Sequence, residues 1–142
     1  MKRYIFAITT VILAVATVFA KDDFVTSLKN CSSYTDSGVV ETEGMQAKST
    51  KKILGWEGDR CVYKEKVNFA GMDVTTTCKF TKSQITELTS VMNAYSLVQK
   101  YSNESIDTSS LSAVQNNPVV KVWNKYMQDS STCSMSGLDG LK

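Results

Sequence analysis

Histidine is absent from this chain of 142 residues. Without an imidazole, the chain's own residues cannot form a Ser-His-Asp triad or a Cys-His nucleophile pair. The four cysteines, at positions 31, 61, 78 and 133, contain no C-x-x-C spacing of the kind found in structural zinc sites and thiol redox motifs. These absences argue against the commonest catalytic and metal-binding arrangements.

Other motifs with a chemical role are also missing. The sequence contains no P-loop, no G-x-G-x-x-G and no G-x-S-x-G. Paired carboxylates can act as acid and base in glycoside hydrolysis. The closest pairs are Asp22 with Asp23, Glu41 with Glu43, and Glu57 with Asp59. We expect them at a frayed start, on an edge strand and in a tight turn, where solvation is their ordinary role. The sequence therefore predicts a protein that is not an enzyme and has no cofactor or metal site.

The first twenty residues, MKRYIFAITTVILAVATVFA, have the layout of a secretory signal peptide. Two basic residues precede an uncharged run over 4–20, and Val18 and Ala20 occupy the −3 and −1 positions of a cleavage site. The alternative is a retained membrane anchor, because the run is just long enough to span a bilayer. Cys31 lies too far beyond the run for lipoprotein attachment. We expect cleavage, a secreted or periplasmic location, and no transmembrane anchor afterwards.

Removal of residues 1–20 also changes the charge balance. It takes away two basic residues and no acid, so that 14 Lys and Arg face 14 Asp and Glu in the rest of the chain. A net charge of zero gives no general reason to expect a nucleic-acid partner. The length fits one small domain, which we place at 21–133. The Ser- and Gly-rich end, 134–142, is typical of a flexible tail.

An even number of cysteines in an exported chain indicates disulfide bonds. Cys61 and Cys78 flank a segment that resembles a β-hairpin, with residues 68–71 as a four-residue loop. In that register the two cysteines lie directly opposite each other, at a Cα separation that a disulfide can bridge. The sequence thus predicts Cys61–Cys78, which leaves Cys31 to pair with Cys133.

The same register divides the hairpin into two faces. Apolar side chains alternate onto one face and mostly polar side chains onto the other. A preceding hairpin places Ile53 opposite Tyr63 and Lys51 opposite Glu65. Lys51 would neutralise Glu65, the one acid expected on the inner face. Residues 38–46 alternate well enough for an edge strand.

The hydrophobic period changes to that of a helix after residue 80. Thr81 and Gln84 form a T-x-x-Q capping box, and apolar residues then follow helical spacing to about residue 101. Farther along, Asn117 and Pro118 are typical of an N-cap followed by proline at the first helical position. We expect a linker over 102–110 and a short helical turn near 111–115.

These elements predict an α+β fold stabilised by disulfides. An antiparallel β-meander of three to four strands, over about 38–80, would have one face covered by two C-terminal helices. We place the two helices at about 82–101 and 118–128.

Six basic residues are expected on the outer face of the sheet, away from the helices. They are Lys48, Lys52, Arg60, Lys64, Lys66 and Lys79. Residues 48–82 hold eight basic and four acidic residues, a local excess in an otherwise neutral protein. This face could dock an anionic partner. The alternative is that its lysines only solvate the sheet and discourage edge pairing. No arginine-rich or aromatic pattern indicates nucleic acid.

A second candidate site is an apolar pocket between the sheet and the helices. Its residues would be Tyr63, Met92, Tyr95, Trp123, Tyr126 and Met127. Methionine and aromatic side chains adapt well to ligands, but at helical spacing in a small domain they also form ordinary core. Trp56, beside a turn, is either an exposed contact residue or a cap on the end of the sheet.

The leading functional hypothesis is a small exported, non-enzymatic binding protein. It would dock an anionic envelope component or another exported protein through the basic face. One alternative is a carrier of a small apolar ligand held between the sheet and the helices. Another is a secreted inhibitor or effector that presents the turn at 56–60 or at 68–71 to its target.

Overall fold

The computed structural model describes residues 22–42, 44–102 and 116–137. The elements in chain order are α2 (Asp22–Asn30), β1 (Tyr34–Thr42), β2 (Met45–Glu57), β3 (Arg60–Phe69), β4 (Met72–Phe80), α3 (Lys82–Ser102), α5 (Pro118–Met127) and β5 (Cys133–Ser136). The five strands form one antiparallel sheet in the order β1-β2-β3-β4-β5. The predicted signal peptide, the linker from residue 103 onward and the helical turn at 111–115 lie outside the described residues.

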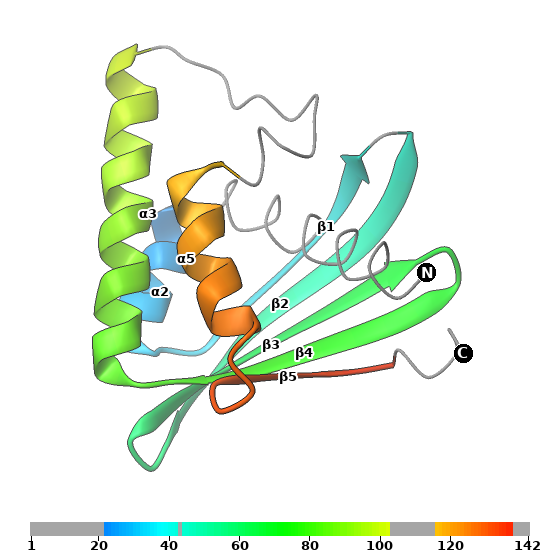
Figure 1. The fold of residues 1–142 in the computed structure, drawn as a ribbon, viewed down its shortest axis with the longest axis horizontal. Coiled ribbons are helices and arrows are strands. Elements are labelled where there is room, and N and C mark those ends of the chain that lie inside the picture. Colours follow the sequence, from blue (N-terminus) through cyan, green and yellow to red (C-terminus); the bar gives the residue numbers. More distant parts are fainter. Residues whose placement is uncertain (1–21, 43, 103–115, 138–142) are drawn as a thin grey trace.

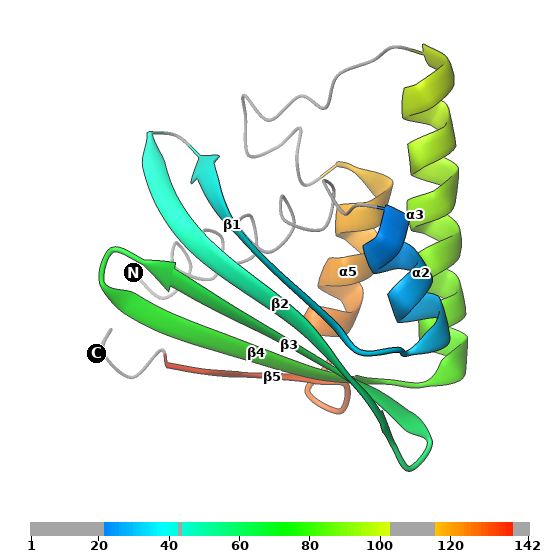
Figure 2. The same cartoon turned by 180° about the vertical axis from the view of Figure 1, so that it is seen from behind.

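The described helices and strands form two layers, with the helices on one face of the sheet (Figure 1). Figure 2 shows that α2, α3 and α5 gather at one end of the sheet, while the β1–β2 and β3–β4 hairpins extend away from them. Helix α3 packs against both α2 and α5. The predicted α+β fold, an antiparallel meander with helices covering one face, is confirmed.

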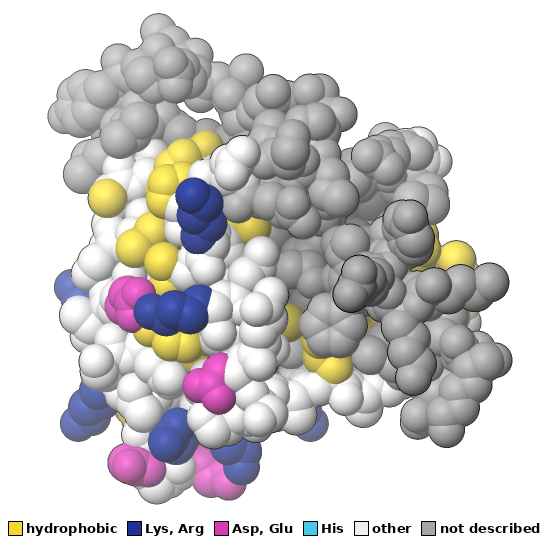
Figure 3. Space-filling view, viewed as in Figure 1, with side chains coloured by type: hydrophobic (Ala, Val, Ile, Leu, Met, Phe, Trp, Pro, Cys, Tyr) yellow, Lys and Arg dark blue, Asp and Glu magenta, His cyan; other side chains and the backbone are white. Residues whose placement is uncertain are grey.

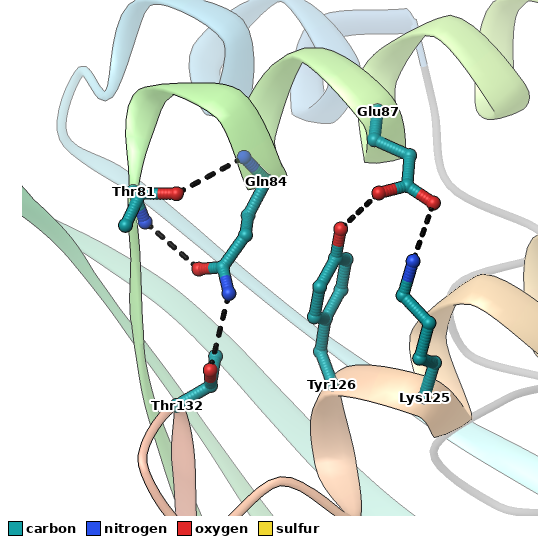
Figure 4. Close-up of polar contacts among 6 residues, drawn as sticks. All are labelled: Thr81, Gln84, Glu87, Lys125, Tyr126 and Thr132. Carbon is teal, nitrogen blue, oxygen red and sulfur yellow. Dashed lines mark hydrogen bonds and ion pairs between the residues drawn. The ribbon is translucent and has the colours of Figure 1, made fainter.

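Both C-terminal helices begin at the capping residues that the sequence predicted. The Thr81 backbone N–H donates to Gln84 Oε1 at 2.9 Å, and the Gln84 N–H donates to Thr81 Oγ1 at 3.2 Å (Figure 4). This reciprocal pair satisfies two backbone donors at the start of α3. At the start of α5, the Val119 N–H donates to Asn117 Oδ1 at 2.9 Å, with Pro118 in the first turn.

The predicted register of the β3–β4 hairpin is wrong by two residues. The turn consists of Ala70 and Gly71 alone, with φ angles of 51° and 78°, so Phe69 pairs with Met72. Two residues at positive φ form the tight turn whose twist matches that of the flanking strands. The sequence-based register assumed a four-residue loop instead. Because side chains alternate with a period of two, this shift leaves every residue on its predicted face.

The two-residue shift also changes the disulfide pairing. Cys61 lies opposite Phe80 rather than Cys78, and the bonds are Cys31–Cys61 and Cys78–Cys133. The predicted pairing, Cys61–Cys78 and Cys31–Cys133, is therefore wrong. The first bond ties the end of α2 to β3, and the second joins directly opposed residues of β4 and β5. The bonds span 30 and 55 residues, and in the chain-entropy model each loop contributes about 4 kcal/mol.

The predicted β2–β3 pairing is confirmed up to Ile53, but the predicted pairing of Trp56 with Arg60 is wrong. Ile53 lies opposite Tyr63, and Lys51 lies opposite Glu65. Beyond Ile53 a bulge shifts the register by one residue, so that Trp56 lies opposite Cys61. A bulge of this kind re-aims the side chains that follow it.

The predicted edge strand over 38–46 is wrong, because this range contains the end of β1, the turn residue Gly44 and the start of β2. Two further elements were missed. Residues 22–30, expected to begin in a frayed start, form α2, whose Phe24, Val25 and Leu28 are buried. The predicted flexible tail at 134–142 begins instead in β5, which continues to Ser136. Gly137 follows with φ of 94°, and a side chain there would collide with the Asp73 carbonyl. Residues 138–142 lie outside the described part.

The core lies between the sheet and the helices and is rich in aromatic rings. Tyr63 of β3 contacts Trp123 of α5 edge-on, at 5.3 Å between ring centroids, and Phe24 of α2 at 6.1 Å. All three side chains are buried. Aromatic contacts of this geometry contribute about 0.5–1.5 kcal/mol each beyond burial. Tyr63 thus helps to hold both helices on the sheet.

Candidate functional site

Three exposed lysines stand on the outer face of β2 and β3. Lys52 and Lys64 are direct register partners, and Lys48 precedes Lys52 by four residues on the same side of β2. That spacing corresponds to about 13 Å along an extended strand. None of the three forms an ion pair within the described residues. We call Lys48, Lys52 and Lys64 the lysine row.

The other three basic residues predicted for this face have polar partners. Lys66 lies 3.8 Å from Asp73, and Lys79 lies 2.9 Å from Glu57. Arg60 donates from Nη1 to the Lys79 carbonyl oxygen at 3.3 Å. Figure 3 shows basic and acidic side chains mixed at the end of the molecule that carries the β2–β3 turn. The structure thus divides the six predicted residues into an unpaired row and a partnered group.

The opposite face of the same sheet holds a buried carboxylate. Glu65 is fully buried, and its carboxylate accepts hydrogen bonds from Ser49 Oγ at 2.7 Å and from the Tyr63 hydroxyl at 2.8 Å. Lys51 lies opposite it, between Glu65 on β3 and Asp36 on β1. The Lys51 ammonium also lies 5.2 Å from the centre of the Phe24 ring. Side chains of the protein therefore supply both the hydrogen-bond donors and the cation that surround the Glu65 carboxylate.

The pKa of Glu65 reflects two opposing effects. Burial raises the pKa of its carboxyl, whereas the Lys51 charge and the two hydrogen bonds lower it, and burial dominates. Burial also raises the pKa of the Tyr63 hydroxyl well above its ordinary value, and the neighbouring Glu65 adds to that shift. The arrangement keeps a polar cluster satisfied inside the core rather than exposing an acid to a substrate.

The six residues of the predicted apolar pocket are brought together by the fold. Tyr63, Met92, Trp123, Tyr126 and Met127 are buried in one hydrophobic cluster, and Tyr95 packs against it. The rings touch one another directly, for example Tyr126 against Phe80 at 6.1 Å between centroids. This contact pattern favours an ordinary core. The carrier hypothesis stays a prediction.

A polar link between α3 and α5 was not foreseen. Lys125 Nζ donates to Glu87 Oε1 at 2.7 Å, and the Tyr126 hydroxyl donates to the other carboxylate oxygen (Figure 4). Both hydrogen bonds favour the charged form, so they lower the pKa of Glu87. Glu87 is far from Lys125 and Tyr126 in the sequence. No local sequence pattern predicts that they are in contact.

Trp56 proves to be exposed and lies on a groove. Its exposed fraction is 43%, and the Lys82 ammonium lies 5.7 Å from the centre of its ring. The groove has a volume of about 390 Å³ and is bordered by α2, α3 and β2. Of the two interpretations of Trp56 from the sequence, its exposure agrees with the first, and its role as a contact residue stays a prediction. The groove itself was not predicted.

The acid pairs considered as catalytic candidates stand apart from these sites. Asp23 lies in the first turn of α2 and is exposed, Glu57 pairs with Lys79, and Asp59 is exposed in the β2–β3 turn. Glu43 lies outside the described residues. Among the described residues, no acid pair lines the groove.

Within the described ranges, no three His, Cys, Asp or Glu side chains come together in a group that could hold a metal ion. None of the helices in these ranges is long and apolar enough to cross a membrane. Searches found no family model, no curated protein and no solved structure that matches the chain. The candidate sites therefore rest on the geometry of this chain.

Proposed function

We propose that this chain is an exported binding protein, without enzymatic activity, that docks onto an anionic lipid surface through the lysine row. Two lines of reasoning support export. The first twenty residues have the layout of a signal peptide, and disulfide bonds persist in oxidising compartments outside the cytosol. All four cysteines are in disulfides.

The observation that carries the docking proposal is the direct opposition of Lys52 and Lys64. Like charges that face each other across antiparallel strands lower stability. Lys66 and Lys79 have acidic partners. Within the described residues, neither Lys52 nor Lys64 has one. An anionic surface against the outer face would offset the repulsion between Lys52 and Lys64. Binding would therefore supply the negative charge that these two lysines do not find within the described part of the protein.

Exposed apolar side chains next to the lysine row favour a lipid surface as the partner. Val39, the register partner of Lys48, is 59% exposed, and Leu54, two residues beyond Lys52, is 55% exposed. Apolar contact and attraction to anionic headgroups act together at a bilayer interface. Each lysine contributes about 1 kcal/mol near such a surface. Three lysines predict weak binding that salt strongly reduces.

The test is sedimentation of the disulfide-bonded protein with vesicles of equal parts phosphatidylcholine and phosphatidylglycerol. We expect Lys52→Gln/Lys64→Gln to weaken binding roughly 30-fold, since two lysines contribute about 2 kcal/mol. Binding of the unchanged protein should fall between about 0.05 M and about 0.5 M salt.

A charge-matched control is available on the opposite side of the molecule. Lys121 and Lys125 lie on α5, which covers the inner face of the sheet, and both are exposed. Lys121→Gln/Lys125→Gln removes the same charge and should leave vesicle binding nearly unchanged. Equal weakening by both double variants would show that net charge alone matters. That result, or failure of the unchanged protein to bind, would overturn the proposal.

A further inference from the structure

The groove beside Trp56 combines an aromatic surface with two cations. It is lined, among others, by Lys29 of α2, Trp56 of β2 and Lys82 of α3. These three residues lie far apart in the sequence and meet only through the packing of α2 and α3 against the end of the sheet. A volume of about 390 Å³ lies within the ordinary range for small-ligand sites.

Trp56 owes its place on the groove to the backbone of β2. The bulge after Ile53 turns Trp56 onto the side of Cys61, where the helices pack. The side chain nevertheless stays 43% exposed. An indole held at a groove wall offers a flat apolar face together with one N–H donor. The apolar C–H face of a sugar ring can stack on such a surface.

No acidic residue is among the described residues that line the groove. Lys82 is the first residue of α3, and the first turn of that helix contains no acidic residue. The positive end of the helix dipole therefore adds to the lysine charges. Neither Lys29 nor Lys82 forms an ion pair within the part of the chain that the structure describes. A carboxylate or sulfate group would find two cations here.

Apart from Ile85, the remaining residues of the groove wall are polar. Thr86, Ser90 and Asn93 follow Lys82 at intervals that place them on one face of α3, over about 16 Å. Ser90 and Asn93 are exposed, and neither side chain has a hydrogen-bond partner among the described residues. Hydroxyl and amide groups both donate and accept, which suits the hydroxyls of a saccharide better than an apolar ligand.

We infer that this groove binds an acidic oligosaccharide. One sugar ring stacks on Trp56, its carboxylate or sulfate lies near Lys29 and Lys82, and the next ring follows the polar face of α3. The site is separate from the lysine row, and its residues take no part in the lipid docking described above.

The test uses the full disulfide-bonded protein and isothermal titration with trigalacturonic acid, a trisaccharide of uronic acids. Maltotriose, which has no charge, serves as the matched ligand. We expect saturable binding of the uronic acid trimer and at least about tenfold weaker binding of maltotriose, because charge-assisted contacts are the stronger ones. Trp56→Ala should weaken uronate binding by at least about tenfold, and Trp56→Phe should restore part of it.

Charge and location are tested by two further variants. Lys82→Gln should weaken binding of the uronate trimer but not of maltotriose. Lys64→Gln, on the outer face, should change neither. Urea unfolding of each variant checks that the fold is intact, and the exposed position of Trp56 makes retention of the fold the expected result.

Several outcomes would overturn the inference. These are the absence of saturable binding to trigalacturonic acid and to its sulfated counterpart, unchanged affinity in a folded Trp56→Ala protein, and equal competition by a short poly-glutamate peptide. The last result would assign the groove to acidic peptides. Because vesicle binding uses the lysine row, loss of one activity without the other separates the two proposals.

Discussion

Lys51 and Lys52 are neighbours in the sequence but lie in opposite environments. Lys51 points to the inner face, where it is buried opposite Glu65. Lys52 points to the outer face, where it is exposed opposite Lys64. The strand period of two sends successive side chains to opposite faces. One lysine therefore stabilises a buried carboxylate, while its neighbour adds to a repulsive pair that is suited to an external anion.

The largest loss of stability is expected when the disulfide between β4 and β5 is removed. Cys78→Ala/Cys133→Ala removes a link across 55 residues, and we expect the free energy of unfolding to fall by about 4 kcal/mol. Urea denaturation monitored by circular dichroism measures this loss. Peptide mapping of the unreduced protein provides the control. A fragment that joins Cys61 to Cys78 would contradict the pairing on which the expected loss depends.

The comparison between the two neighbouring lysines can be tested directly. Lys51→Met leaves Glu65 buried without its cross-strand cation, so we expect a loss of about 3 kcal/mol in the free energy of unfolding. Lys52→Met is the matched control and should change it by no more than about 0.5 kcal/mol. Equal effects in urea denaturation would mean that the two environments do not differ energetically.

The stability contribution of Glu65 should depend on pH with a definite sign. Because burial raises its pKa in the folded protein, its contribution is fully present below the unfolded pKa of about 4.3 and is lost as the pH rises through the folded pKa. The stability of the unchanged protein relative to Glu65→Gln should therefore fall as the pH rises above about 4. Urea midpoints at several pH values measure the difference.

The stability contribution of Glu87 should depend on pH with the opposite sign, and it serves as a control. Its hydrogen bonds to Lys125 and Tyr126 lower its pKa, so its contribution is present above the unfolded pKa and is lost as the pH falls through the folded pKa. The stability difference between the unchanged protein and Glu87→Gln should thus shrink in acid. If the Glu65 difference instead grew with pH, attraction to Lys51 would outweigh burial.

The smallest change in the free energy of unfolding is expected for a substitution on the outer face of the sheet. Lys64→Glu converts the repulsive pair with Lys52 into an attractive one, which should raise the free energy of unfolding by about 0.5 kcal/mol. The same change should weaken vesicle binding, because it reverses one charge of the lysine row. Stability and binding would then move in opposite directions. If both fell together, the repulsion between the two lysines would have no measurable role.

Much of the fold follows from local patterns in the sequence. The capping residues Thr81 and Asn117 mark the starts of α3 and α5. The inner and outer faces of β3 and β4 were also predicted correctly, although the register was not. A shift of two residues preserves the faces, so the hydrophobic pattern could not distinguish a two-residue turn from a four-residue loop.

The missed elements depend on contacts that no local pattern reveals. Helix α2 is short for an independent helix, and burial of Phe24 and Leu28 together with the Cys31–Cys61 bond supports it. Strand β5 has four residues, and the Cys78–Cys133 bond joins it to β4. In the groove, only Trp56 carried a signal in the sequence, as an aromatic residue beside a glycine-rich turn.

The sequence by itself determined the fold class, the starts of α3 and α5, and which side chains of β3 and β4 share a face. Caps and hydrophobic periods act over a few residues, so they can be recognised along the chain. Only the tertiary structure decided which cysteines bond and that Trp56 and Lys82 share a groove. Each of these features depends on which segments of the chain become neighbours in space. Segments that are distant in the sequence become neighbours only when the helices pack against the sheet.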